Sequence, residues 1–136
     1  RGLGDVYKRQ RDDLDMTTAA APLKEDEYDD PSAVKVVVNQ KGEALYFSRS
    51  LIPYPRNEFS VPPLKHVGIY AYRRDFLLAY AGMKQTPLEK TESLEQLRAL
   101  EMGYKIGVIC IDSEDIGIDT EEDLKKANRL FERSHQ

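Results

Sequence analysis

The 136-residue sequence predicts a single α/β domain in which helices flank a mixed sheet. Segments rich in β-branched and aromatic residues alternate with segments whose apolar residues recur at helical spacing. Residues 104–111 (YKIGVICI) form an almost continuous apolar run, which is typical of a strand buried in a parallel sheet. This alternation favours stacked layers of sheet and helix, with at least part of the sheet parallel.

Charge and composition exclude several classes of protein. The net charge of −4 falls entirely within residues 1–30, which hold nine acidic and five basic residues, so no broad basic field is available for nucleic acid. No apolar run approaches the roughly 20 residues of a membrane helix, and the start lacks the pattern of a signal peptide. We therefore expect a cytoplasmic protein without membrane contact. The single cysteine, Cys110, and the two histidines, His66 and His135, exclude a disulfide framework and a Cys- or His-based metal cluster.

Residues 1–32 are expected to be a weakly ordered lead-in and linker. The first ten residues have the character of a non-native junction, without helical or strand periodicity. Residues 12–31 mix acidic residues with threonine and alanine, and they bury too little apolar surface to offset the entropy of ordering them. The folded part is therefore predicted to be residues 33–136.

Three strands and a long loop are predicted next. Residues 33–39 (AVKVVVN) and 44–49 (ALYFSR) have strand character, and Gly42 lies in the turn between them, which indicates a β-hairpin. Residues 50–65 contain four prolines and are predicted to be a loop that no central strand can include. Residues 66–72 (HVGIYAY) are predicted to form the third strand.

Helices are predicted before and after the apolar run. Residues 73–83 place apolar side chains at helical spacing. Thr86 and Ser93 each begin a capping-box pattern, which indicates a helical region with a break that ends at Gly103. Thr120 is predicted to cap a last helix, so the expected order is β-β-loop-β-α-α-β-α.

Polar residues gather at two places before the helices. Arg49 and Arg56 bracket the proline-rich loop, where forked hydrogen bonds could clamp a carboxylate or a phosphate, although composition alone favours ordinary surface arginines. His66 and Tyr70 lie on one face of their strand and flank Gly68, across a gap that a ligand could enter. The alternative is a strand-end histidine beside a half-buried tyrosine.

Two further places follow. Glu95 and Gln96 lie off the apolar stripe of their helix, and they are either ligand contacts or solvated surface residues. Asp119 lies where a loop meets a helix, and a single carboxylate with water and substrate phosphates is a normal way to hold Mg²⁺. Alternatively, Asp119 has no function of its own and merely precedes the helix cap Thr120. The sequence has no glycine-rich phosphate loop and no nucleophile constellation, and Cys110 is expected to be an inert core thiol.

These places, in this order, resemble the C-terminal half of the 3-deoxy-manno-octulosonate (Kdo) cytidylyltransferases, or CMP-Kdo synthetases. The likeness begins near Asp30 and covers about 100 of the 136 residues. The motifs that carry it are ALYFSRSLIPYPR, HVGIYAYR, TPLEKTESLEQLRALEMG and GIDTEEDL. The first two are specific to this family and its closest relatives, whereas GIDTEEDL also occurs in related nucleotidyltransferases.

The resemblance implies a partial nucleotidyltransferase fold, Rossmann-like and of the GT-A type, with a β-hairpin and loop extension. Residues 33–136 would be the sugar-binding and dimerisation half of a cytoplasmic homodimer that uses CTP, Kdo and Mg²⁺, releases pyrophosphate and serves lipopolysaccharide synthesis. Residue roles are implied motif by motif. The sugar-binding residues would be Arg49, Arg56, His66, Tyr70, Glu95 and Gln96, the arginines near the sugar carboxylate and the others on its hydroxyls, and the metal ligand would be Asp119.

The family's CTP-binding half is not recognisable in this sequence. Its glycine- and basic-rich loop, its cytosine pocket and its second metal-binding aspartate are absent, so we expect the chain alone to be inactive. One alternative is a related CMP-sugar synthetase for sialic acid or an amino-Kdo. Another is a non-catalytic half-domain for dimerisation and sugar binding.

Overall fold

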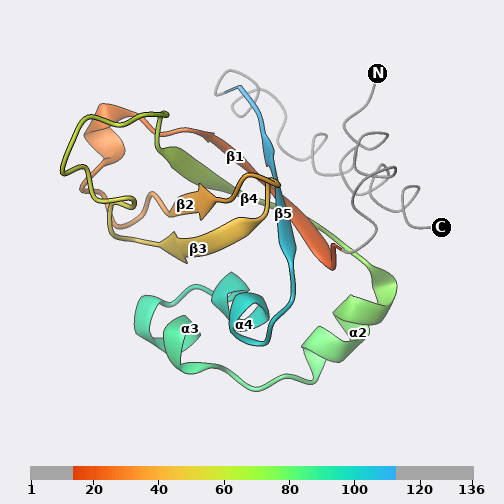
Figure 1. Cartoon of the computed structure of the whole chain (residues 1–136). Helices are drawn as coiled ribbons and strands as arrows, with labels where there is room; N and C mark the ends of the chain where they lie inside the picture. The colour runs from red at the N-terminus through yellow and green to blue at the C-terminus, as the bar shows by residue number, and fades with distance from the viewer. Residues whose placement is uncertain (1–13, 113–136) are drawn as a thin grey trace, which may run out of the picture.

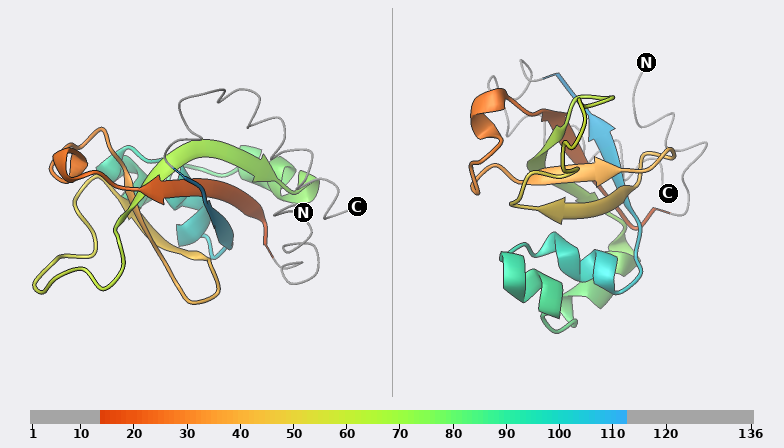
Figure 2. Two further views of the ribbon diagram at one scale, coloured as in Figure 1. Left: turned by 90° about the horizontal axis from the view of Figure 1, so that it is seen from above. Right: turned by 60° about the vertical axis from the view of Figure 1, so that its left-hand side comes forward.

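The computed structural model describes residues 14–112 and confirms the predicted α/β fold with a mixed sheet (Figure 1). Five strands lie side by side in the order β3-β2-β4-β1-β5. Among these described strands, β1 and β5 run parallel, and the other neighbours are antiparallel. The helices of residues 74–81, 87–92 and 96–101 lie together below one face of the sheet (Figure 2). The predicted last helix and Asp119 lie outside the described residues.

The second strand from one edge of the sheet comes from the segment that was expected to be a lead-in. Strand β1, Met16–Pro22, pairs with β4 on one side and with β5 on the other, and six of its seven residues are buried. The expectation of weak order through residue 32 is therefore wrong for this part. Small side chains from Thr17 to Ala21 carry little strand signal of their own, and the two neighbouring strands supply the burial.

The predicted hairpin and third strand are confirmed, with small shifts at their ends. Strands β2, Lys35–Val38, and β3, Ala44–Ser48, pair antiparallel. Gly42 has a φ of 79°, a conformation that glycine adopts without strain and that the turn between them requires. Strand β4, Leu64–Tyr72, begins two residues earlier than predicted, directly after the proline-rich loop.

The helical region lies between β4 and the last strand. Helix α2 is Arg74–Ala81, α3 is Pro87–Glu92, α4 is Gln96–Glu101, and strand β5 is Ile106–Cys110. The break between α3 and α4 was predicted, but Ser93 does not begin a helix. It ends α3 in the left-handed conformation, with a φ of 56°.

The main core fills the space between the sheet and the helices. The largest of its fully buried side chains are Phe47 from β3, Met16 from β1 and Leu97 from α4. A smaller apolar cluster, which includes Ala19 and Val67, lies apart from it. Within residues 14–112 no helix is long and apolar enough to cross a bilayer. Helix α4 packs against β3, and its first residue, Gln96, lies close to His66 on β4.

Candidate functional site

His66 is the centre of a cluster formed by β1, β3, β4 and α4. Its ring packs edge-on against Phe47 with 4.9 Å between centroids, and it lies 5.5 Å from the ring of Tyr70. Its Nε2 lies 2.9 Å from Thr18 Oγ1, and its Nδ1 lies 3.5 Å from Nε2 of Gln96. The structure therefore brings together three of the predicted sugar-binding residues, His66, Tyr70 and Gln96. We call these three the neutral cluster.

The neutral cluster is kept uncharged by burial. Burial lowers the pKa of His66 from 6.5 to about 4, so its imidazole is neutral near pH 7. Burial also raises the pKa of Tyr70, so its phenol keeps its proton. Gln96, which is 6% exposed, adds an amide that has no charge at any pH. Neutral donors and acceptors of this kind are suited to hydroxyl groups.

The pKa of His66 predicts an acid-dependent loss of stability. The unfolded chain takes up a proton below about pH 6.5, whereas folded His66 resists protonation until about pH 4, so stability falls as the pH drops through that window. When the pH is lowered from about 7.5 to 5, this effect of His66 lowers the unfolding free energy of the wild type by about 2 kcal/mol. Denaturant titrations at both pH values should show that His66→Gln loses less stability than the wild type by this amount. Equal pH dependence of the two proteins would contradict the assignment.

The neutral cluster borders open space. Gly68 is exposed between His66 and Tyr70, and a Cβ atom added to it would meet nothing within 4 Å. Within the described part of the chain, the Tyr70 hydroxyl has no hydrogen-bond partner. The predicted opening at Gly68 is therefore present, and the phenol beside it is available to a ligand.

Arg49 uses its guanidinium to tie segments of the chain together. Nε donates to the carbonyl oxygen of Glu92 (2.7 Å), Nη1 to that of Pro31 (2.8 Å) and Nη2 to that of Ser93 (3.0 Å). The Glu92 carboxylate accepts from the backbone N–H of Arg49 in return (2.9 Å). These contacts hold the left-handed turn at Ser93, after which Glu95 and α4 begin. The predicted contact of Arg49 with a sugar carboxylate stays a prediction.

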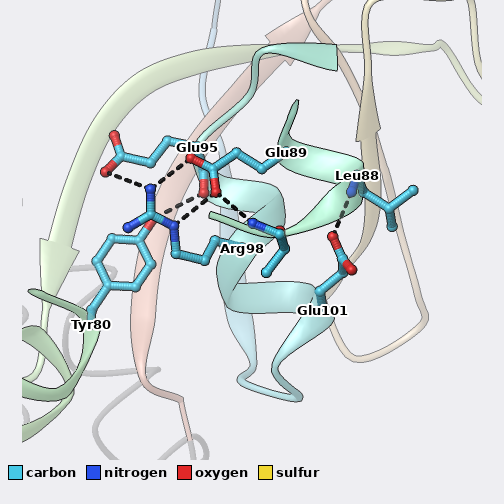
Figure 3. A network of polar contacts seen from close by, with 7 residues as sticks. Tyr80, Leu88, Glu89, Glu95, Arg98 and Glu101 are labelled. Atoms are coloured by element: carbon cyan, nitrogen blue, oxygen red, sulfur yellow. Dashed lines mark hydrogen bonds and ion pairs between the residues drawn. The ribbon is translucent and has the colours of Figure 1, made fainter. Parts of the chain in front are cut away.

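Glu95 lies beside Arg98 and Glu89, at the turn between α3 and α4 (Figure 3). Its side chain is 68% exposed, and Oε2 lies 4.0 Å from Nη2 of Arg98. Arg98 makes two hydrogen bonds with the Glu89 carboxylate, of 2.8 and 2.6 Å, and its guanidinium lies over the ring of Tyr80. An open hollow of about 560 Å³ is lined by Gln85, Glu89, Lys90, Ser93, Glu95 and Arg98. Of the predicted site residues, Glu95 alone lines this hollow.

The last two predicted site residues are not joined to the cluster. Arg56 is exposed on the proline-rich loop, and within residues 14–112 its guanidinium has no hydrogen bond or ion pair. Asp119 lies outside the described residues. The described residues contain no group of three His, Cys, Asp or Glu side chains that could hold a metal ion. The role of Asp119 as a magnesium ligand stays a prediction.

Sequence reasoning missed several residues that shape the site. Thr18 lies in the segment taken as a lead-in, and its only signal was a run of eight uncharged residues between Asp15 and Lys24. Lys35 is fully buried, and its Nζ donates to the carbonyl oxygens of Asp30 (2.8 Å) and Arg49 (2.9 Å). Arg98 binds the buried Glu89 carboxylate, and the sequence analysis did not single it out. No local pattern marks partners of this kind, because they come from distant parts of the chain.

Comparison with known proteins identifies the family. A family model described as "Cytidylyltransferase" matches residues 5–106. The chain belongs to the cytidylyltransferase family. The match begins well before Asp30, so the segment that contains β1 is part of the family likeness.

Members of this family with the name 3-deoxy-manno-octulosonate cytidylyltransferase are close relatives of the chain. The protein of Solibacter usitatus is 52% identical over 106 residues, which cover 77% of this chain and 42% of that protein. The protein of Acaryochloris marina is 48% identical over 126 residues, which cover 92% of this chain and 51% of that protein. The chain therefore spans about half the length of these relatives.

A solved structure supports the same relationship. The structure of CMP:2-keto-3-deoxy-manno-octonic acid synthetase complexed with CTP matches this chain with a TM-score of 0.75 and 43% sequence identity. The match covers 94% of this chain and 53% of that one. The predicted nucleotidyltransferase-type α/β fold is confirmed by this neighbour.

Proposed function

We propose that this chain supplies the sugar-binding part of a cytidylyltransferase that transfers CMP from CTP to Kdo and releases pyrophosphate. The observation that carries the proposal is the neutral cluster of His66, Tyr70 and Gln96 beside the open space at Gly68. Uncharged donors and acceptors of fixed position can hold sugar hydroxyls and orient the one that attacks the nucleotide. The remaining groups for CTP would belong to the part of the relatives that this chain does not match.

The relatives support the identity of both substrates. The names of the two relatives specify a Kdo cytidylyltransferase, and the solved neighbour was determined with CTP. The same proposal includes Arg49 and Arg56 near the sugar carboxylate, Glu95 on the sugar and Asp119 on Mg²⁺. It also includes a cytoplasmic homodimer that serves lipopolysaccharide synthesis. The strong exposure of Tyr54 on the proline-rich loop, 83%, supports a subunit contact there.

Binding of Kdo to the purified chain tests the proposal. With ¹⁵N-labelled histidine, we expect added Kdo to shift the imidazole resonances of His66 and to leave those of His135 unchanged. Gln96→Leu removes one hydrogen-bonding group of the neutral cluster, so it should weaken Kdo binding by at least about fivefold. Gln40→Leu makes the same change at an exposed position of the hairpin turn and should leave binding unchanged.

Two outcomes would contradict the proposal. If millimolar Kdo leaves the His66 resonances unmoved, the neutral cluster is not the sugar site. If N-acetylneuraminate shifts the same resonances at lower concentration than Kdo, the chain belongs to the alternative class that activates sialic acid.

A further inference from the structure

The Thr18 hydroxyl lies where the pairing of β1 with β4 is interrupted. Thr18 is paired with Tyr70. The next residue, Ala19, is paired with Val67, so β4 has two extra residues at this point and forms a bulge. The bulge brings two carbonyl oxygens to Thr18 Oγ1, that of Ile69 at 2.7 Å and that of Val67 at 3.2 Å.

The Thr18 hydroxyl has one proton, and it donates this proton to the carbonyl oxygens of the bulge. A carbonyl oxygen accepts hydrogen bonds and cannot donate them, so the Thr18 proton must point at the bulge, with the Ile69 oxygen the nearer acceptor. Toward His66 Nε2, 2.9 Å away, Thr18 Oγ1 then presents only a lone pair. The ring must supply the proton of that bond, and Nε2 of His66 is therefore the protonated nitrogen.

The other ring nitrogen, Nδ1, faces the side chain of Gln96. In a neutral imidazole with a proton on Nε2, Nδ1 has a lone pair and accepts hydrogen bonds. The amide nitrogen of Gln96 lies 3.5 Å from Nδ1, a long contact that leaves the acceptor weakly satisfied. Burial among Phe47 and Tyr70 keeps the ring neutral and so prevents a second proton on Nδ1.

We propose that Thr18 is a positioning residue that fixes His66 as the Nε2-protonated tautomer and thereby makes Nδ1 an acceptor for a hydroxyl group of the ligand. Thr18 itself does not touch the ligand in this scheme, because its hydroxyl is enclosed by β4 and by the ring of His66. The ligand part of this inference rests on the proposed function, whereas the tautomer does not.

The tautomer can be measured directly without any ligand. Long-range ¹H–¹⁵N correlation spectra of the chain with labelled histidine distinguish the two nitrogens of each ring, and only His66 and His135 contribute. We expect a protonated Nε2 and an unprotonated Nδ1 at His66 in the wild type and in Thr18→Ser, which keeps the hydroxyl. In Thr18→Val, which keeps the shape and loses the acceptor, the ratio of the two tautomers should fall by about fivefold or more.

Thr17→Val is the matched control. The hydroxyl of Thr17 is also buried on β1, but in the described part of the structure it has no hydrogen-bond partner, so its removal should leave the His66 tautomer unchanged. A wild-type His66 protonated on Nδ1 would overturn the inference, even if Thr18→Val does not fold. An unchanged ratio in folded Thr18→Val would also overturn it.

Kdo titrations of the same variants separate this inference from the proposed function. If the tautomer responds as expected, Thr18→Val should bind Kdo more weakly by a similar factor, and Thr18→Ser should restore binding. If no variant binds Kdo, including the wild type, the proposed function fails, and the tautomer spectra still decide the role of Thr18.

Discussion

Replacing Arg98 with methionine is expected to lower the free energy of unfolding by about 4 kcal/mol, because it leaves a buried carboxylate without its partner. Glu89 is 5% exposed, and both of its oxygens accept from the Arg98 guanidinium (Figure 3). Arg98 also lies 5.1 Å from the centroid of the Tyr80 ring, a contact that methionine cannot replace in kind. Urea or guanidinium titrations of the purified chain measure the effect.

The pH dependence of this effect gives a second check on its cause. Hydrogen bonding from Arg98 lowers the pKa of Glu89, so the pair contributes most at neutral pH and loses its contribution as the pH falls through the lowered pKa of Glu89. The difference between the wild type and Arg98→Met should therefore shrink in acid. Lys90→Met, at an exposed position of α3, should change stability by less than about 0.5 kcal/mol. A loss in Arg98→Met no larger than in this control would show that the buried pair is not what holds α3 to α4.

The elements that the sequence predicted correctly carry strong local signals. Strands β2, β3 and β5 are rich in valine, isoleucine and aromatic residues, and each was predicted within about two residues of its bounds. Strand β1 was missed because three of its seven residues are alanines, which are depleted in strands, and two threonines alone are a weak signal. Its burial comes from pairing with β4 and β5. A strand with neighbours on both sides can be built from weak strand formers when tertiary contacts supply the stability.

In the candidate site, too, some contacts could be predicted from local sequence and others could not. The period of a strand predicted that His66 and Tyr70 share a face, and their rings lie 5.5 Å apart as expected. Two other contacts of His66 could not be predicted from local spacing. Gln96 lies 30 residues away in the sequence and Thr18 lies 48 residues away, and the packing of β1 and α4 around β4 brings both to the ring. Residue types can therefore suggest the chemistry of a site, whereas the partners that set a tautomer or hold a turn appear only in the folded chain.

Arg49 is the residue for which the predicted and observed contacts differ most, and replacing it should separate its two roles. Arg49→Met should lower the free energy of unfolding by about 3 kcal/mol, because the carbonyl oxygens of Glu92, Pro31 and Ser93 each lose a charged donor. Arg49→Lys keeps the charge but can replace only part of this fork, so its free energy of unfolding should lie between those of the wild type and Arg49→Met. Arg56→Met is the matched control, and since this guanidinium has no partner within residues 14–112, its stability should equal that of the wild type.

Kdo binding by the same three variants then decides whether Arg49 also contacts the sugar. If Arg49 acts by holding the turn at Ser93, the loss of Kdo affinity in Arg49→Lys should follow its loss of unfolding free energy. The reason is that Gln96 keeps its place beside His66 only while that turn is held. If the guanidinium also grips the sugar carboxylate, Arg49→Lys should lose affinity beyond that proportion, since a lysine cannot form the two parallel bonds of an arginine. An Arg49→Met chain as stable as the wild type would remove the positioning role, and the three carbonyl contacts would then be incidental to the fold.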